Sequence, residues 1–209
     1  MTTPTDQPDF ADDTTLLPAI VQHAETLQVL MLGYMNRQAW EHTLASRQVT
    51  FFSRSRQQQW TKGETSGHTL RLVSSTIDCD QDTILVMALP AGPTCHRNTT
   101  SCFSAETAPG PGFLAHLAAV IAQRAATGAE GEVGARPSYT SSLLAEGTPR
   151  VAQKVGEEAV ETVIAAMKGD VPELINEAAD LLYHLLVLLH DQACELSDVI
   201  DVLRERHRA

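Results

Sequence analysis

The chain has 209 residues, of which 43% are hydrophobic and 20% charged, and its formal net charge at pH 7 is −11. This length suits one large domain or two domains of about 100 residues each. The acidic balance argues against nucleic-acid binding, which needs a basic surface, but a bound divalent cation can still attract a phosphorylated substrate.

Residues 1–15 are polar and acidic, and we expect them to form a flexible segment. They lack the basic and apolar regions of a signal peptide. The longest apolar-rich run, residues 181–189, is too short to cross a membrane. Four cysteines in such a chain indicate cytosolic thiols or metal ligands rather than disulfides. We therefore expect a cytoplasmic protein with no membrane partner.

Residues 16–106 carry the pattern of a mainly β domain. Short apolar and β-branched runs predict strands at residues 29–32, 49–52 and 83–87. Residues 37–46 fit one short helix, with Asn36 as its N-cap.

A turn-rich segment follows at residues 60–67, with the sequence WTKGETSG. Its glycines, its hydroxyls such as Ser66 and the cation of Lys62 could bind a phosphate, although the pattern alone is not specific. His68 follows in a polar, glycine-flanked position, where a lone histidine is more often structural than catalytic.

The segment Asp78-Cys79-Asp80-Gln81-Asp82 alternates three carboxylates with a thiol. If the segment is extended, its period of two places the carboxylates on one face and Cys79 on the other. Because oxygen and sulfur ligands suit different metals, one strand could serve two metal sites.

Two more thiols, Cys95 and Cys102, lie in polar, turn-like sequence, and together with Cys79 they are candidate metal ligands. Three protein ligands with one open position are typical of catalytic zinc. The alternative is that these cysteines are small buried residues, which is the better interpretation of Cys194 in its apolar context. His96 is either a fourth ligand or, as we favour, a general acid/base or substrate contact.

Two Pro-Gly pairs predict a linker at residues 107–112, and the pattern becomes helical over residues 113–209. We expect helices at residues 113–127, 151–167, 174–189 and 197–206, with a loop from 128 to 138 and Ser197 as the last N-cap. The predicted fold class is multidomain α+β, with an N-terminal, mainly β metal-binding domain and a C-terminal all-α helical bundle.

Two of these helices carry acidic faces. Lys154, Glu158 and Glu161 share one face at i, i+4 and i+7, next to Glu157. In the next helix Glu177, Asp180 and His184 share a face at i, i+3 and i+7. If the helices pack antiparallel, four or five carboxylates converge and repel one another unless a cation such as Mg²⁺ lies among them. The alternative is a solvated helix surface, and spacing alone does not decide between the two.

Taken together, these segments resemble two enzyme families. In the first half, WTKGETSG at 60–67, DCDQD at 78–82 and GPTCH…SCF at 92–103 resemble phosphoribosyl-AMP cyclohydrolase. In the second half, SYT at 138–140, KVGEEAVE at 154–161 and NEAADLLYH at 176–184 are similar to phosphoribosyl-ATP pyrophosphatase. Both motif sets in this order resemble the bifunctional histidine-biosynthesis protein of bacteria.

The resemblance implies that the C-terminal domain hydrolyses phosphoribosyl-ATP to phosphoribosyl-AMP and pyrophosphate. Its Mg²⁺ ligands would be Glu158, Glu161, Glu177 and Asp180. The N-terminal domain would then open the N1–C6 bond of the adenine ring of phosphoribosyl-AMP, giving the formimino-AICAR phosphoribotide, with water activated by Zn²⁺.

The resemblance also implies the ligands of the first domain: Cys79, Cys95 and Cys102 for Zn²⁺, and Asp78, Asp80 and Asp82 for Mg²⁺. In that family Cys79 reaches a zinc whose other thiolates belong to the partner subunit, which implies a homodimer with shared zinc sites. The catalytic candidates are His96, Lys62, Glu64, His68 and Glu157. The candidate substrate contacts are Trp60, Lys62, Ser66 and Lys154.

Two departures from the family pattern stand out. Asn98 occupies a position where the family commonly has glycine, and asparagine tolerates the positive φ that the turn needs. The loop at residues 128–136 is longer than expected. The competing hypotheses are a broader nucleotide pyrophosphatase fused to a deaminase-like hydrolase, and a non-catalytic scaffold that joins a zinc knot to a helical bundle.

Overall fold

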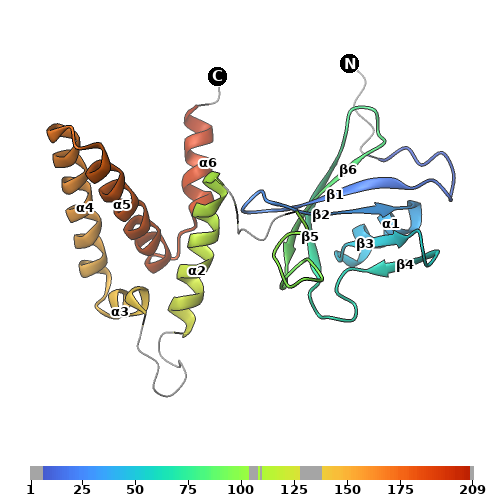
Figure 1. The fold of residues 1–209 in the computed structure, drawn as a ribbon, viewed down its shortest axis with the longest axis horizontal. Coiled ribbons are helices and arrows are strands. Elements are labelled where there is room, and N and C mark those ends of the chain that lie inside the picture. Colours follow the sequence, from blue (N-terminus) through green and yellow to red (C-terminus); the bar gives the residue numbers. More distant parts are fainter. Residues whose placement is uncertain (1–6, 104–107, 109, 128–137, 208–209) are drawn as a thin grey trace. The chain divides into compact units, whose positions relative to one another are not determined.

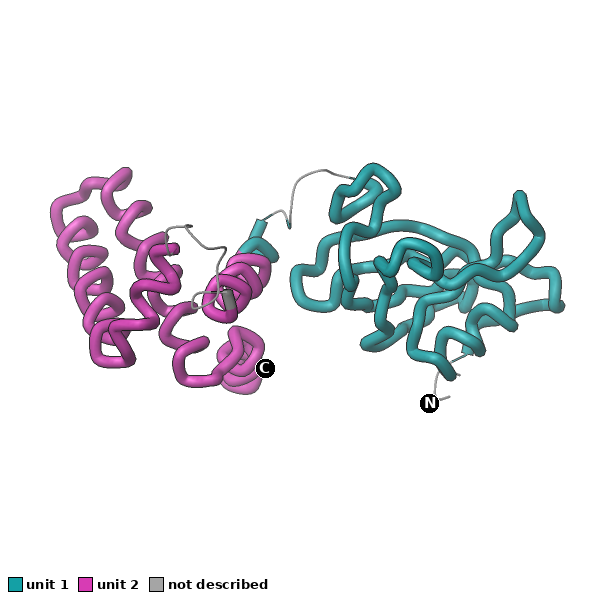
Figure 2. The backbone as a smooth tube through the Cα atoms, turned by 90° about the horizontal axis from the view of Figure 1, so that it is seen from below, with its two compact units in different colours: residues 1–113 teal, residues 114–209 magenta. Residues whose placement is uncertain are grey.

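The computed structural model describes residues 7–103, 108, 110–127 and 138–207, and these form two compact units. Residues 1–113 make the first unit and residues 114–209 the second (Figure 2). The first is mainly β and the second is helical, which confirms the predicted fold class. The predicted boundaries at 16–106, 107–112 and 113–209 stay predictions, and of that linker residues 107 and 109 lie outside the described residues.

A four-stranded sheet is the framework of the first unit (Figure 1). Its strand order is β2-β1-β6-β5, with β1 and β6 parallel and the other neighbours antiparallel. The strands are β1 (Leu17–His23), β2 (Val29–Met35), β5 (Leu70–Ile77) and β6 (Ile84–Pro90). A second, two-stranded sheet pairs β3 (Thr50–Ser53) with β4 (Gln58–Thr61).

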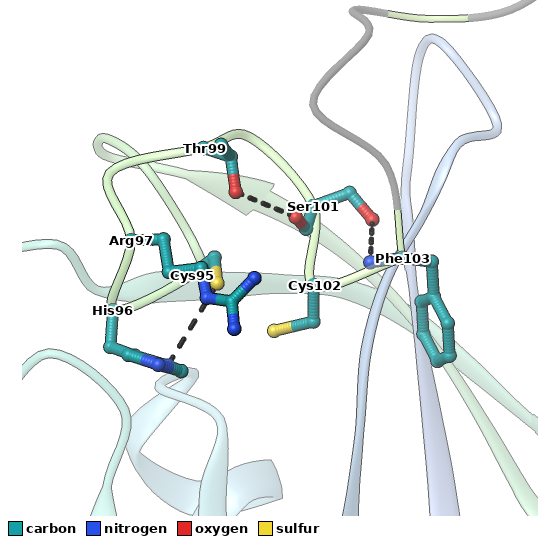
Figure 3. A pocket seen from close by; sticks show the side chains of 7 residues that line it. All are labelled: Cys95, His96, Arg97, Thr99, Ser101, Cys102 and Phe103. Atoms are coloured by element: carbon teal, nitrogen blue, oxygen red, sulfur yellow. Dashed lines mark hydrogen bonds between the residues drawn. The ribbon is translucent and has the colours of Figure 1, made fainter.

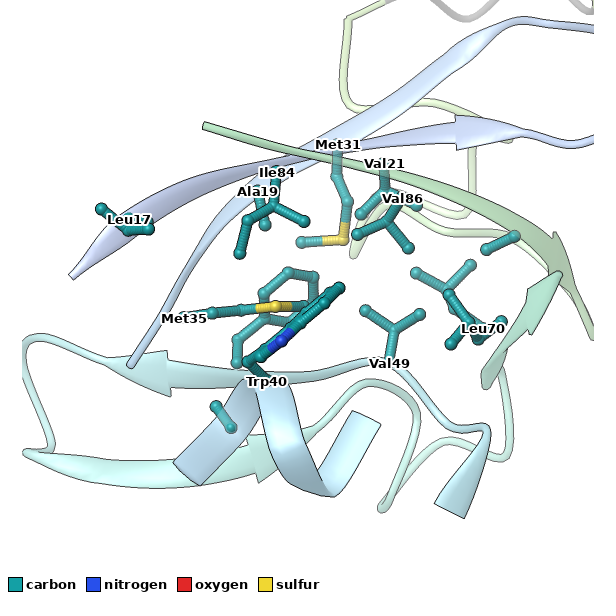
Figure 4. Close-up of a cluster of buried hydrophobic side chains, with 14 of the residues drawn as sticks. Leu17, Ala19, Val21, Met31, Met35, Trp40, Val49, Leu70, Ile84 and Val86 are labelled. Atoms are coloured by element: carbon teal, nitrogen blue, oxygen red, sulfur yellow. The ribbon is translucent and has the colours of Figure 1, made fainter. Parts of the chain in front are cut away.

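The core of this unit lies on one face of the larger sheet, because every second residue of its central strands is buried. In β6 these residues are Ile84, Val86 and Ala88. Trp40 of helix α1 (Arg37–Ser46) covers them (Figure 4). Phe51 of strand β3 belongs to the same cluster. The strands predicted from residues 29–32, 49–52 and 83–87 are therefore confirmed as β2, β3 and β6.

Helix α1 begins where the sequence predicts. The side chain of Asn36 accepts a hydrogen bond from the backbone N–H of Ala39 at 2.9 Å, which satisfies one free donor of the first helical turn. The helix ends at Arg47, which adopts a left-handed conformation with φ of 59°.

The N-terminal segment differs from the flexible stretch that we expected. Phe10 is 4% exposed and belongs to the core. The Arg37 guanidinium donates to its carbonyl at 2.7 Å, and the backbone N–H of Asp9 donates to the Gln81 carbonyl at 3.0 Å. The described part of this segment is therefore packed against the first unit at residues 9 and 10.

The second unit contains five α-helices within the described residues: α2 (Phe113–Thr127), α3 (Tyr139–Ala145), α4 (Thr148–Lys168), α5 (Val171–Asp191) and α6 (Leu196–Arg206). Their common core joins Ile121 of α2, Leu143 of α3, Val151 of α4 and Val187 of α5. One turn of 3₁₀ helix, Gly110–Gly112, precedes α2. The loop expected at 128–138 lies outside the described residues up to 137, and Ser138 caps α3.

Helices α4 and α5 pack side by side as an antiparallel hairpin (Figure 1). Gly169, with φ of 73°, ends α4, and the side chain of Asp170 accepts from the Glu173 N–H to begin α5. Both helices begin three residues earlier than the sequence predicts, because Pro149 and Pro172 are tolerated in a first helical turn.

The predicted N-cap of the last helix is wrong by two residues. The N-cap of α6 is Glu195 rather than Ser197. Its backbone N–H donates to the Asp198 carboxylate at 2.8 Å, so the acidic residue three positions later sets the helix start. None of the helices in the described parts of the chain is long and apolar enough to cross a membrane.

Candidate metal centres

The segment from Asp78 to Asp82 is a turn, so the prediction of an extended strand is wrong. Strand β5 ends at Ile77 and β6 begins at Ile84. The Asp78 carboxylate accepts the backbone N–H groups of Asp82 at 3.0 Å and Thr83 at 2.9 Å, which folds the chain back on itself. Gln81 has a φ of 66° within this turn.

The turn nevertheless gathers the predicted carboxylates. Ligand atoms of Asp78, Asp80 and Asp82 all lie within 4.8 Å of one another, and all three residues are exposed. The backbone N–H of Thr83 is the main cause that lowers the pKa of Asp78. Oxygen ligands of this kind fit Mg²⁺. Cys79 is exposed in the same turn but does not belong to this group.

The loop that follows β6 holds the other two predicted thiols, Cys95 and Cys102. It surrounds an open hollow of about 360 Å³ lined by Cys95, His96, Arg97, Thr99, Ser101, Cys102 and Phe103 (Figure 3). The loop is closed by two bonds of Cys95, whose N–H donates to Thr99 O and whose carbonyl accepts from Asn98 N, both at 3.0 Å. Asn98 has a φ of 60°, which confirms that this asparagine supports the turn.

The two thiols influence each other. The backbone N–H of Arg97 lowers the pKa of Cys95, and the hydroxyl of Thr99 and the thiol of Cys102 act in the same direction. Burial raises the pKa of Cys102, and its neighbour Cys95 adds to this shift, whereas the charge of Lys62 opposes it. The lowered pKa makes the thiolate, which is the form that binds Zn²⁺, easier to reach at Cys95 than at an ordinary cysteine.

Cys79 does not join these two thiols within one chain. It lies in the turn before β6, whereas the loop of Cys95 and Cys102 follows β6 at the other end of the sheet (Figure 1). Strand β6 has seven residues, which at about 3.3 Å per residue separates its ends by roughly 20 Å. Zinc–sulfur bonds are about 2.3 Å long. One chain therefore offers two of the three predicted zinc ligands at one place.

The loop after β4 lies at the thiol end of the sheet. The backbone of Ala91, just after β6, donates to Thr69 O at 2.9 Å. A Cβ atom on Gly92 would approach the His68 ring to 2.7 Å, so this ring packs directly on the chain that leads to Cys95. Of the predicted catalytic residues, Lys62 thus lies near Cys102, His68 packs on the chain before Cys95, and His96 lines the hollow.

Other members of this loop make local contacts. Lys62 Nζ donates to His68 O at 3.4 Å, the Glu64 carboxylate accepts from Thr61 N at 3.0 Å, and Ser66 Oγ accepts from His68 N at 3.3 Å. The Trp60 ring, a predicted substrate contact, packs at 5.3 Å from the Phe51 ring and is only partly buried. These bonds hold the loop in shape. They do not test the substrate contacts predicted for Trp60, Lys62 and Ser66, which stay predictions.

The helical unit gathers a second acidic group between α4 and α5. Ligand atoms of Glu158, Glu161 and Glu177 lie within 4.8 Å of one another. Burial raises the pKa of Glu177, and the charges of Glu161 and Glu158 add to the shift, followed by that of Asp180. The predicted convergence thus holds for three carboxylates, with the exposed Asp180 close enough to act on Glu177 but outside the group.

Lys154 and Glu157 lie on the rim of this group and neutralise each other. Lys154 Nζ contacts the Glu158 carboxylate at 2.6 Å and the Glu157 carboxylate at 3.0 Å. These bonds raise the pKa of Lys154 and lower the pKa of both glutamates. Glu157 also accepts from Gln153 at 2.8 Å and pairs with Arg150 at 3.5 Å, so its carboxylate faces cations rather than the acidic group.

Two further residues of this site received no role from the sequence. His184 is 4% exposed, and its Nδ1 lies 3.7 Å from the Glu158 carboxylate. Its Nε2 is hydrogen-bonded to the Tyr139 hydroxyl at 3.0 Å. The seven-residue spacing from Glu177 placed His184 on the acidic face. No spacing rule connects it with Tyr139, because Tyr139 belongs to a separate helix 45 positions earlier in the chain.

Comparison with known proteins agrees with both halves. Residues 31–104 match the family model for phosphoribosyl-AMP cyclohydrolase, and residues 117–207 match the model for phosphoribosyl-ATP pyrophosphohydrolase. The chain is 54% identical over 200 residues to the histidine biosynthesis bifunctional protein HisIE of Salmonella typhimurium, covering 96% of the chain and 95% of that protein. The protein of the same name from Vibrio cholerae is 51% identical over 206 residues, covering 98% and 95%.

The chain belongs to the HisIE family. It is a hydrolase that combines the cyclohydrolase and pyrophosphohydrolase activities of histidine biosynthesis, which confirms the resemblance noted from the motifs. The alternatives of a non-catalytic scaffold and of a broader nucleotide pyrophosphatase are set aside by these relationships.

Proposed function

We propose that the two activities use separate metal centres, and that a second copy of the chain completes the cyclohydrolase centre. In the pyrophosphohydrolase domain, Glu158, Glu161 and Glu177 hold Mg²⁺, with Asp180 as a fourth ligand. The observation that carries this assignment is the convergence of three carboxylates from two helices in the region that matches the pyrophosphohydrolase model.

The donor set fits the metal. The ligands are all oxygen atoms, and burial and the charges of Glu161 and Glu158 raise the pKa of Glu177, a repulsion that a bound cation would relieve. When bound, Mg²⁺ supplies positive charge for the phosphate oxygens and for the attacking water. Water then breaks the bond between the α and β phosphates of phosphoribosyl-ATP, leaving phosphoribosyl-AMP and pyrophosphate.

The role proposed for Lys154 changes from substrate contact to support of the metal ligands. Its ammonium group is already engaged by Glu158 and Glu157. Glu157, which is held by Arg150 and Lys154, keeps that lysine in place. Arg150 is 39% exposed in its side chain and pairs with the surface residues Glu146 and Glu157, so it can exchange these partners for a phosphate.

In the cyclohydrolase domain, we assign Zn²⁺ to Cys95 and Cys102 of one subunit and Cys79 of another. Thiol donors and the lowered pKa of Cys95 fit this metal. When bound, Zn²⁺ lowers the pKa of water that attacks C6 of the adenine ring. The Asp78, Asp80 and Asp82 carboxylates, next to Cys79 in sequence, hold Mg²⁺ at the same composite site.

Side chains near the thiols supply proton transfer and substrate contacts. His96 Nδ1 lies 3.9 Å from Cys95 Sγ and its side chain lines the open hollow, which supports a role in proton transfer. We propose it as general acid/base, with His68, Lys62 and Glu64 as further catalytic candidates. Trp60 and Ser66 remain the proposed substrate contacts.

A homodimer is supported by a second observation in the helical unit. Around the turn between α4 and α5, Val163, Met167, Val171 and Ile175 are 62%, 84%, 60% and 63% exposed. Two large apolar side chains exposed on each of these helices, four residues apart, are typical of an interface. A second copy of this chain would cover them. We further propose that the dimer works in the cytoplasm, as the four free thiols suggest.

The test is a product time course. Purified protein receives phosphoribosyl-ATP with Mg²⁺ and Zn²⁺, and pyrophosphate, phosphoribosyl-AMP and the ring-opened product are measured. We expect pyrophosphate first and the ring-opened product second. Release of pyrophosphate without any later ring opening in the zinc-loaded protein would contradict the composite zinc centre, and ring opening before pyrophosphate release would contradict the assigned order.

A further inference from the structure

The pyrophosphohydrolase domain buries a histidine for which the proposed reaction has no use. His184 lies on α5 and is 4% exposed. It is enclosed by two tyrosine rings, with ring centroids 5.2 Å away for Tyr183 and 6.0 Å for Tyr139, both in edge-on contact. A polar ring in such a place needs hydrogen-bond partners for both of its nitrogen atoms.

Both nitrogen atoms have partners, and these define the proton position. Nδ1 lies 2.8 Å from the carbonyl oxygen of Asp180, which can only accept, so Nδ1 carries the hydrogen. In the neutral ring Nε2 is then an acceptor, and the Tyr139 hydroxyl at 3.0 Å donates to it. The ring orientation is thus fixed from two helices, α5 and α3.

The same ring borders the most buried of the acidic residues. Glu158 is 5% exposed, and its Oε1 lies 3.7 Å from His184 Nδ1 and 2.6 Å from Lys154 Nζ. Neither contact involves Oε2. Lys154 therefore holds one oxygen of the carboxylate by an ion pair, and the His184 ring packs beside that oxygen and limits its movement, while Oε2 is left for another ligand.

We propose that His184 and Tyr139 are positioning residues of the pyrophosphohydrolase: Tyr139 fixes the His184 ring, and the ring fixes Glu158 for Mg²⁺. This inference rests on the proposed magnesium centre. Outer partners of metal ligands commonly change metal affinity or activity by roughly 10-fold to 100-fold when they are removed. Tyr139 does not touch the acidic group itself, so its effect should travel through the imidazole.

The chain offers a matched control. Tyr183 Oη is bonded to Thr140 Oγ1 at 2.8 Å, in the same cluster but not at a nitrogen of His184. Tyr139→Phe and Tyr183→Phe each remove one hydroxyl and keep the ring. Only the first takes away the hydrogen bond that orients His184.

The experiment measures pyrophosphate release from phosphoribosyl-ATP over a range of Mg²⁺ concentrations in the full-length protein. We expect Tyr139→Phe to raise the Mg²⁺ concentration for half-maximal rate about 3-fold to 10-fold, and Tyr183→Phe to leave it within 2-fold. His184→Leu should raise it at least about 10-fold, and His184→Asn, which keeps an N–H near Nδ1, should recover part of the loss.

Ring opening of added phosphoribosyl-AMP, catalysed by the other domain, controls for the amount of active protein, and helical circular dichroism with its thermal transition reports whether the second unit of each variant is folded. An unchanged Mg²⁺ dependence in Tyr139→Phe, or equal shifts in the Tyr139 and Tyr183 variants, would overturn the inference even if His184→Leu failed to fold. If the unmodified protein released pyrophosphate without any dependence on Mg²⁺, the proposed magnesium centre itself would be at fault.

Discussion

Cys79 and Cys95 lie at opposite ends of strand β6, one in the turn before it and one in the loop after it. The strand keeps them roughly 20 Å apart, far beyond the reach of one metal ion. If both bind the same zinc, they must come from different subunits. The cyclohydrolase is then active only as an oligomer, whereas the three carboxylates of the pyrophosphohydrolase come together within one chain.

Removing one thiol should separate the two activities. We expect Cys102→Ala to stop the reaction sequence at phosphoribosyl-AMP while pyrophosphate release continues, because Cys102 lies in the first unit and the acidic helices in the second. Chromatographic separation of the products checks this. Cys194, which the sequence predicted to be buried, is exposed in the helical unit. Cys194→Ala is therefore the control and should keep both steps. Loss of both activities in a folded Cys102→Ala protein would contradict the two-site account.

Neutralising one carboxylate should have the converse effect. Glu161 belongs to the acidic group between α4 and α5, so Glu161→Gln should lower pyrophosphate release by roughly 100-fold or more through weaker Mg²⁺ binding. Added phosphoribosyl-AMP should still be opened at the normal rate. Glu205→Gln, on the exposed face of α6, serves as the charge-matched control. A Glu161→Gln protein with normal pyrophosphate release would remove this residue from the metal site.

The acidic group should destabilise the protein when no metal is bound. Burial and neighbouring carboxylates raise the pKa of Glu177 in the folded state, so folding favours its protonated form. Its unfavourable contribution is absent below the ordinary glutamate pKa, grows as pH rises above that value, and is complete above the folded pKa.

Glu177→Gln should therefore raise the melting temperature of the metal-free protein at pH 7 while abolishing efficient pyrophosphate release. The gain should be smaller at pH 5, and added Mg²⁺ should stabilise the unmodified protein more than the variant. Thermal unfolding with and without a chelator measures both effects. A lower melting temperature for the metal-free variant at pH 7 would show that Glu177 is not repelled by its neighbours.

The helical part of this account could be predicted from sequence because its signals are local. The 3.6-residue period put Glu158 and Glu161 on one face of α4 and Glu177 on the acidic face of α5, and these carboxylates do meet. Asn36 likewise marked the start of α1. The Asp78 turn was missed because the Asp78 carboxylate accepts the backbone N–H groups of Asp82 and Thr83. An alternating pattern of residue types does not predict such local side-chain to backbone bonds. The separation of Cys79 from Cys95 depends on how β6 is placed in the sheet, and no motif spacing contains that information.

A pair of glycines tests the loop that borders the thiol site. Gly63 and Gly67 have φ values of 85° and 77°, but only at Gly63 would a Cβ atom meet the backbone of His68, at 2.3 Å. Gly67→Ala should cost about 1 kcal/mol for its left-handed conformation alone. Gly63→Ala must also displace the loop, so it should cost about 2–3 kcal/mol and lower ring opening without changing pyrophosphate release.

Denaturant unfolding and the two activity assays measure these effects. Equal losses of stability and of ring-opening activity in the two glycine variants would contradict the role given to this close approach.

The most direct test of the shared zinc centre is complementation between two inactive proteins. Cys79→Ser and Cys102→Ser are each expected to lack ring-opening activity as homodimers. In a mixed dimer, one composite site carries both substitutions and the other carries none. Equal mixing under conditions of subunit exchange should therefore restore about one quarter of the normal rate, since about half of the dimers are mixed and each has one intact site. If the mixture stays inactive although mixed dimers are shown to form, the zinc centre is not built from two chains.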